Sequence, residues 1–137
     1  NHQRMTDERA KKINNICHFI PKQTLTGSTQ DSLLVLSWGG TQGSVSTAIE
    51  HLRKQGASVA HAHIKYLNPF PINLEEIISQ FKHVLVFELN NQQLVKVIRS
   101  QYAISARSVT QVKGLPFKVH EVIESINHHL KEIKNDD

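Results

Sequence analysis

A glycine-rich turn is the first segment whose residue types could bind a ligand. Gly39-Gly40-Thr41-Gln42-Gly43 stands between an apolar run and an amphipathic stretch. Backbone N–H groups at the start of a helix can hold an anion, and glycines let it approach closely. However, Trp38 stands where the first glycine of the dinucleotide fingerprint belongs, and no lysine follows as in a Walker loop. We therefore expect tight packing of the turn, with phosphate binding as the alternative.

Two histidines have a spacing that metal sites use. His61 and His63 alternate along an apolar segment and would point to the same side of a strand. No cysteine pair, His-Glu-x-x-His helix or carboxylate cluster supplies further ligands. The pair therefore favours structural or interfacial histidines, and we predict no metal site and no catalytic residue in this chain.

A polar cluster follows the third apolar run. It consists of one carboxylate, Glu88, and the four amides of Asn90, Asn91, Gln92 and Gln93. Asparagine can cap the first N–H groups of a helix, which would explain one of these amides. The ends of parallel strands also face ligands and partners, which would explain several of them. Both interpretations remain open from the sequence.

Four apolar runs predict the strands that position these groups. They cover residues 33–36, 59–64, 84–87 and, more weakly and nearer a sheet edge, 109–112. Each is followed by a segment with apolar residues at helical spacing. This alternation predicts an α/β fold, a three-layer α/β/α sandwich with a mainly parallel sheet. Within it, Leu94, Val97 and Ile98 mark one buried helix face, and Asn73 is placed to cap another helix with Glu76.

The residues before the sandwich have a different character. Residues 6–19 show an apolar helical stripe, and residues 22–31 are polar and read as a flexible connector with too few apolar groups to pack. We predict a leading helix and connector over 1–31 and one α/β domain over 32–137. The first residue is not methionine, as in a fragment excised from a longer polypeptide.

Composition excludes several classes of function. Sixteen basic and twelve acidic side chains give a formal charge of +4, but the charges alternate and form no basic block, so no nucleic acid partner is implied. No segment has the roughly 20 apolar residues needed to cross a bilayer, so no membrane partner is expected. The single cysteine, Cys17, cannot form an internal disulfide, which fits a cytoplasmic protein.

The loops that follow the predicted strands should gather at one edge of the sheet. Several carry aromatic side chains, which favour an interface when exposed. We predict a docking or ligand surface at this edge, formed by Trp38, Gly39, Gly40, Thr41, Gln42, Gly43, Tyr66, Asn68, Phe70, Glu88, Asn90, Asn91, Gln92 and Gln93.

The same loops resemble those of a known family. Residues 38–43, 63–71, 88–94 and 114–117 occur in an order and spacing similar to the C-terminal domain of the 2-oxoacid:ferredoxin oxidoreductase alpha subunit. The 2-oxoglutarate type is the closest resemblance, and the likeness extends from about Met5 to Ile133. It implies a fold like the C-terminal domain of transketolase.

The resemblance also implies an activity for the whole enzyme. Such an enzyme oxidatively decarboxylates a 2-oxoacid with coenzyme A to an acyl-coenzyme A, using thiamine diphosphate with Mg and an iron–sulfur cluster that passes electrons to ferredoxin. By this resemblance, thiamine diphosphate lies between a preceding pyrimidine-binding domain and a partner subunit. One cysteine cannot hold a cluster that needs four thiolates, so we expect neither cofactor on this domain.

By this resemblance, its partners are an upstream pyrimidine-binding domain of the same subunit, the beta subunit and, for the whole enzyme, ferredoxin. The domain itself would be noncatalytic and serve interdomain and subunit packing. The alternative is a free-standing module that binds phosphate or coenzyme A at the glycine turn.

Overall fold

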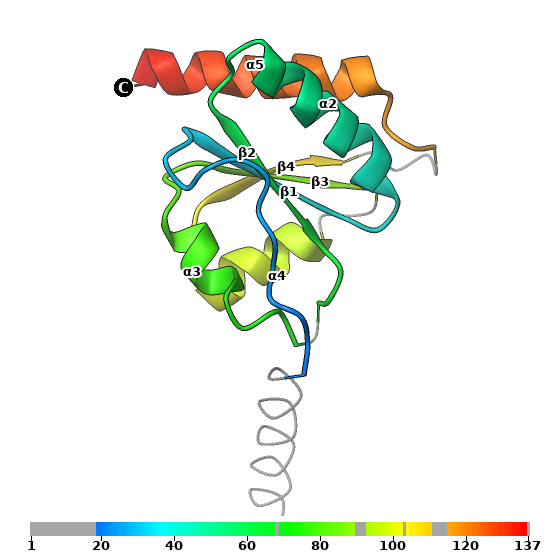
Figure 1. Ribbon diagram of the computed structural model, residues 1–137, viewed down its shortest axis with the longest axis vertical. Coiled ribbons are helices and arrows are strands. Elements are labelled where there is room, and N and C mark those ends of the chain that lie inside the picture. The colour runs from blue at the N-terminus through cyan, green and yellow to red at the C-terminus, as the bar shows by residue number, and fades with distance from the viewer. Residues whose placement is uncertain (1–18, 68, 90–92, 103, 111–114, 137) are drawn as a thin grey trace, which may run out of the picture.

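The computed structural model describes residues 19–67, 69–89, 93–102, 104–110 and 115–136 (Figure 1). Within these residues, four strands form one sheet: β1 (Leu33–Trp38), β2 (Val59–Ile64), β3 (Val84–Glu88) and β4 (Ala106–Thr110). Their order is β2-β1-β3-β4, and every neighbouring pair is parallel. The strand predicted at 109–112 begins earlier than expected and lies at an edge, as predicted. Apart from Phe19, the predicted leading helix lies outside the described residues.

Helices cover both faces of this sheet. Helices α2 (Gln42–Lys54) and α5 (Val119–Asp136) pack on one face, and α3 (Leu74–Ser79) and α4 (Gln93–Tyr102) on the other (Figure 1). The predicted three-layer α/β/α sandwich is therefore confirmed. None of the helices in the described part of the chain combines the length and apolar composition needed to span a bilayer.

Each face of the sheet has its own hydrophobic core. Successive side chains of a strand point to opposite faces, so Leu33 and Val35 pack under α2 and α5, while Leu34 and Leu36 pack against α3 and α4. This double burial explains the uninterrupted apolar runs. The chain thus closes both faces of the sheet with its own helices, as expected of a domain that folds by itself.

The buried face of α4 differs from the one predicted. Leu94 and Ile98 are buried as expected, but Val97 is 45% exposed and Val95 is completely buried. The Glu88 carboxylate holds the N–H groups of Leu94 and Val95 against the end of β3. This attachment sets the rotation of the helix and directs Val95 inward.

The prediction of a flexible connector at 22–31 is wrong. Thr26 forms an antiparallel bridge with His61 on the outer edge of β2, and the two N···O distances are 2.8 and 2.9 Å. Further along, the Asp31 carboxylate accepts a hydrogen bond from the Arg53 guanidinium at 2.9 Å. Polar contacts therefore hold the connector where apolar ones are scarce, and it covers part of an otherwise open sheet edge.

Asn73 does not act as the helix cap that the sequence predicts. Its side chain makes no capping bond to α3. Instead, Asn73 Oδ1 accepts from the Gln23 N–H at 2.7 Å, and Asn73 Nδ2 donates to the Gln23 carbonyl at 3.0 Å. Two bonds to the connector backbone satisfy both polar atoms of the amide, which a single capping bond would not do.

Replacing Asn73 with alanine tests this attachment. We expect the Asn73→Ala variant to lose about 1–2 kcal/mol of unfolding free energy, because two partly buried hydrogen bonds disappear. Hydrogen exchange at the Thr26 amide should become faster, because the connector is released nearby. Urea denaturation and exchange measurements check both effects. Ser79→Ala, which removes an exposed bond to the Glu76 carbonyl, is the control, and equal behaviour of the two variants would contradict the role given to Asn73.

Candidate functional site

The carboxyl ends of the strands lie along one edge of the sheet. Because the strands are parallel and in register, Trp38 is beside Ile64, and Glu88 is beside Thr110. The loops after β1, β2 and β3 therefore begin at this edge, as the sequence predicts. Of the predicted site residues, Asn68, Asn90, Asn91 and Gln92 lie outside the described residues.

Glu88 is inside the domain rather than on its surface. Its side chain is completely buried, and its two carboxylate oxygens accept the N–H groups of Leu94 at 2.8 Å and Val95 at 2.9 Å. The Trp38 indole N–H lies 3.3 Å from the same carboxylate. A negative group at the N-terminus of a helix satisfies free donors and complements the helix dipole. Glu88 thus caps α4, a role that the sequence suggests for the asparagines that follow it.

The glycine turn is closely packed against its surroundings. Gly39 has a φ of +65°, which a side chain would disfavour. A Cβ atom on Gly40 would lie 3.3 Å from the Leu89 side chain. Thr41 is buried, and its hydroxyl donates to the Trp38 carbonyl at 2.9 Å. Local packing therefore accounts for these residues without a ligand.

Gln42 and Gly43 belong to the first turn of α2 rather than to a loop. Gly43 has open space around the position of a Cβ atom, so packing does not require its lack of a side chain. In the same turn, the Ser44 hydroxyl donates to the Phe117 carbonyl and ties α2 to the segment before α5. The start of α2 therefore presents a fixed surface.

The predicted site residues divide into an exposed and a buried group. Thr41, Phe70 and Glu88 are buried, which corrects their assignment to a surface, and Phe70 packs beside the Tyr102 ring at a centroid distance of 5.8 Å. These three buried side chains support the carboxyl edge of the sheet from inside the domain. Trp38 is partly buried. We call the exposed group the carboxyl-edge surface; it consists of Gly39, Gly40, Gln42, Gly43, Tyr66 and Gln93.

A buried serine links the two histidines of β2. Ser37 Oγ lies 2.7 Å from His61 Nε2 and 2.8 Å from His63 Nδ1. The spacing of the histidines predicts their common side of the strand, but no local pattern marks Ser37, whose position opposite His63 follows from the register of β1 and β2. Among the described residues, no group of three or more His, Cys, Asp or Glu side chains is arranged to hold a metal ion.

Burial favours the neutral form of both histidines. The pKa of His61 is lowered to about 4, chiefly by burial and secondarily by the nearby His63. The pKa of His63 is also lowered, again chiefly by burial and then by the charge of Lys65. A neutral histidine has one N–H and one acceptor nitrogen, so the serine hydroxyl can join the two rings in a continuous chain of hydrogen bonds.

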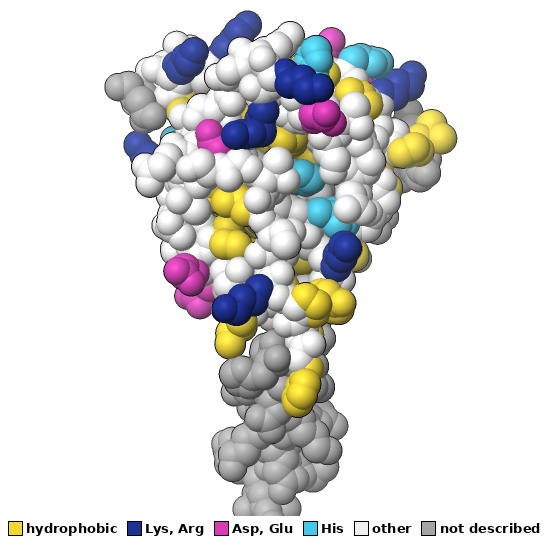
Figure 2. All heavy atoms as spheres, viewed as in Figure 1, with side chains coloured by type: hydrophobic (Ala, Val, Ile, Leu, Met, Phe, Trp, Pro, Cys, Tyr) yellow, Lys and Arg dark blue, Asp and Glu magenta, His cyan; other side chains and the backbone are white. Residues whose placement is uncertain are grey.

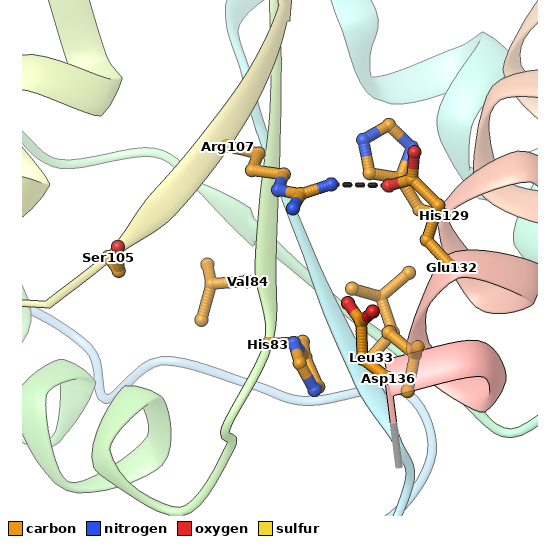
Figure 3. A pocket seen from close by; sticks show the side chains of 9 residues that line it. Leu33, His83, Val84, Ser105, Arg107, His129, Glu132 and Asp136 are labelled. Atoms are coloured by element: carbon orange, nitrogen blue, oxygen red, sulfur yellow. Dashed lines mark hydrogen bonds and ion pairs between the residues drawn. The ribbon is translucent and has the colours of Figure 1, made fainter.

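A small cavity lies at the opposite edge, where the strands begin (Figure 3). Arg107 from β4 and Glu132 from α5 form an ion pair across it, with His83 and Asp136 nearby. Its volume of about 50 Å³ is far below that of pockets for organic ligands. This cavity therefore offers room for water rather than for a substrate.

The fold is that of a known class of domain. A parallel sheet covered by helices on both faces is the architecture of the transketolase C-terminal domain, and the chain is similar to a split-gene transketolase with a TM-score of 0.57. That likeness covers 79% of this chain and 41% of the transketolase chain at 15% identity, and it concerns the fold alone.

The sequence match is more specific. Residues 32–129 match the family model described as pyruvate:ferredoxin oxidoreductase core domain II, and the chain belongs to this family.

Two relatives are similar over most of the chain. The 2-oxoglutarate oxidoreductase subunit KorA of Mycobacterium tuberculosis is 40% identical over 123 residues, which cover 89% of this chain and 18% of the relative. The structure of a 2-oxoglutarate:ferredoxin oxidoreductase from Magnetococcus marinus, with 2-oxoglutarate, coenzyme A and succinyl-CoA bound, matches with a TM-score of 0.86 and 27% identity. That match covers 94% of this chain and 23% of the other. The chain spans about a fifth of the length of its curated relatives.

Proposed function

We propose that the chain is the C-terminal domain of the alpha subunit of a 2-oxoacid:ferredoxin oxidoreductase of the 2-oxoglutarate type. The observation that carries the proposal is the 40% identity to KorA over 123 residues. The whole enzyme would act in the cytoplasm and convert a 2-oxoacid and coenzyme A to an acyl-coenzyme A, passing electrons to ferredoxin. Residues 1–31 would lead into the domain, which would comprise residues 32–137.

In this proposal the domain is noncatalytic, and the other parts of the enzyme hold thiamine diphosphate, Mg and the iron–sulfur cluster. The polar groups at the carboxyl edge support this role. Glu88 holds α4, Ser44 holds the segment before α5, and Ser37 joins two histidines inside the domain. These groups stabilise a rigid surface, which suits docking to the upstream pyrimidine-binding domain and the beta subunit.

An activity assay tests the proposed function. The 137-residue chain alone, given 2-oxoglutarate, coenzyme A, thiamine diphosphate, Mg and a viologen dye, should not reduce the dye. The enzyme assembled from the complete alpha subunit that contains this chain and its beta subunit should reduce it, and faster with 2-oxoglutarate than with pyruvate. Turnover by the chain alone, or none by the assembled enzyme with any 2-oxoacid, would contradict the proposal.

A substitution at Gly43 tests the docking role separately from folding. The position has open space for a side chain and lies in the first turn of α2, so Gly43→Arg should fold with unchanged or slightly higher stability. In the assembled enzyme, however, the arginine should weaken subunit or domain association about tenfold or more, because a buried steric clash typically costs more than about 1.4 kcal/mol. Analytical ultracentrifugation and thermal denaturation measure the two effects.

The matched control for Gly43→Arg is Ser100→Arg. Ser100 is exposed in the later part of α4. The nearby Arg99 contacts the start of β4, so this end of the helix lies toward the amino edge of the sheet. Normal association of Gly43→Arg, or equal weakening by both variants, would remove the carboxyl-edge surface as a docking site.

A second candidate function is binding of phosphate or coenzyme A at the glycine turn. One observation favours it: the N-cap residue Thr41 makes no side-chain capping bond to α2, and the first turn of this helix contains no acidic residue. Calorimetry with coenzyme A and nucleotides tests this alternative. If a ligand bound at the glycine turn, its heat of binding would disappear in Gly43→Arg. We expect no such effect, and observing it would favour the alternative.

A further inference from the structure

A pocket beside β2 contains cationic side chains that the proposed docking role leaves unexplained. The connector and the chain that follows β2 enclose a volume of about 180 Å³. Its lining includes Lys22, Thr24, His63, Lys65 and Tyr66, with no carboxylate among the described lining residues. Figure 2 shows histidine and basic side chains close together on the face of the molecule that includes the connector. We call this hollow the β2-edge pocket.

Positive charge in the β2-edge pocket is not neutralised by any residue that the structure describes. Lys22 and Lys65 are both exposed, and neither forms an ion pair with a described residue. The charge of Lys65 contributes, after burial, to lowering the pKa of His63, so its field reaches the imidazole in the pocket wall. Two ammonium groups on one rim attract an anion of more than one negative charge.

The connector places these groups with a defined geometry. The Gln23 side chain donates to the His63 carbonyl at 2.9 Å, and its backbone is held on both sides by Asn73. Lys22 and Thr24, the neighbours of Gln23, are thereby held beside β2. The attachment of the connector to β2 and Asn73 therefore forms one wall of the pocket.

Hydrogen bonding leaves one nitrogen of His63 for a ligand. His63 Nδ1 bonds to Ser37, and no described residue bonds to the remaining ring nitrogen, Nε2. If Ser37 donates to His63 Nδ1, the proton of the neutral ring must be on Nε2, where it is a donor. Ser37 then accepts its own hydrogen bond from His61 Nε2–H. In the opposite arrangement, His63 Nδ1–H donates to Ser37, and Ser37 donates to His61 Nε2. His63 Nε2 is then an acceptor.

We propose that the β2-edge pocket binds a phosphate group, with Lys22, Lys65, the Tyr66 hydroxyl and His63 Nε2–H as donors. A phosphate presents three terminal oxygens in different directions, which matches donors from both the connector and the end of β2 better than a planar carboxylate does. Binding selects the arrangement in which Ser37 donates to His63. The tautomer of the buried His61 therefore changes with occupancy, although His61 does not line the pocket.

Nuclear magnetic resonance of the histidine rings tests the proposal. The 137-residue chain, labelled with nitrogen-15, is titrated with inorganic phosphate, glycerol phosphate and acetate at constant ionic strength. We expect saturable shifts of the His63 ring with either phosphate, and an increase in the Nε2–H tautomers of both His61 and His63. Whichever phosphate binds more tightly indicates a free or an esterified ligand, and both results support the site. Binding of acetate as tight as that of phosphate would overturn the choice of ligand.

Lysine variants locate the binding. Lys65→Gln and Lys22→Gln should each weaken phosphate binding roughly tenfold, the loss expected for one charge-assisted hydrogen bond. Lys96→Gln, which removes an exposed ammonium from α4, should leave binding unchanged. Absence of saturable shifts in the unmodified chain, or equal affinities in all three variants, would overturn the site.

Ser37→Ala tests the connection between the rings. Phosphate should then shift the His63 signals while the tautomer of His61 no longer responds. A response of His61 equal to that in the unmodified chain would show that the serine does not couple the histidines. If this variant fails to fold, the comparison of Lys65→Gln with Lys96→Gln still decides whether the pocket binds phosphate.

Discussion

The Glu88→Ala variant is expected to lose about 2–6 kcal/mol of unfolding free energy, because two buried backbone N–H groups lose their acceptor and each costs about 1–3 kcal/mol. The same change removes the partner of the Trp38 indole. The start of α4 and the end of β1 should therefore loosen together. Urea denaturation measures the loss, and tryptophan fluorescence reports the environment of Trp38.

Two further variants define the cause of this loss. Glu88→Gln keeps one oxygen acceptor and replaces the other with a donor, so its loss should be intermediate. Glu75→Ala removes an exposed carboxylate from the first turn of α3 and should cost less than about 1 kcal/mol. If Glu88→Ala costs no more than Glu75→Ala, the carboxylate is not the main attachment of α4.

Acidification should destabilise the protein through His61. Its pKa is about 4 in the folded chain and 6.5 in the reference state, so between these values the unfolded state binds the proton more strongly. Stability contributed by the neutral imidazole is complete above about pH 6.5 and is lost as the pH falls toward 4. The shift corresponds to a loss of about 3 kcal/mol.

The comparison of His61→Gln with the unmodified chain isolates this effect. The glutamine does not titrate, so its stability should fall by about 3 kcal/mol less between pH 7 and pH 4, as measured by urea denaturation at each pH. Other charged groups also face this region: His63 and Lys65 follow along the chain, and Glu50, Arg53 and Lys54 of α2 share a hollow with His61. These groups remain in both proteins, so the difference isolates the titration of His61 together with its interaction with His63.

The control for His61→Gln is His51→Gln, which removes an imidazole from an exposed position of α2. It should retain the acid sensitivity of the unmodified chain. Equal protection by both substitutions would show that burial of His61 is not the cause.

The proposed docking role and the proposed phosphate site depend on different residues. Gly43→Arg is directed at docking through the carboxyl-edge surface, while Lys65→Gln is directed at phosphate binding in the β2-edge pocket. Tyr66 belongs to both regions, so its substitution would not separate them. Failure of phosphate binding would leave the assignment to the oxidoreductase family intact.

The layers of this fold follow from the amino-acid pattern of each segment. Continuous apolar runs such as 33–36 and 84–87 identify strands buried on both faces. The apolar residues at helical spacing after the first run are buried in α2, as expected of a covered helix; they are Val45, Ala48, Ile49 and Leu52. The parallel arrangement then brings the strand ends to one edge. These features depend on burial and periodicity, which each segment carries in its own residues.

The pairing of polar groups, in contrast, depends on how the whole chain folds. Trp38 and Glu88 are 50 residues apart, as are Gln23 and Asn73, and Ser37 reaches two histidines through the register of adjacent strands. The local pattern around Asn73 favoured a cap, and the composition of residues 22–31 favoured flexibility, but distant partners satisfied these groups instead. Hydrogen bonds depend on position to within a fraction of an ångström, and that position is set by the order and register of the whole sheet.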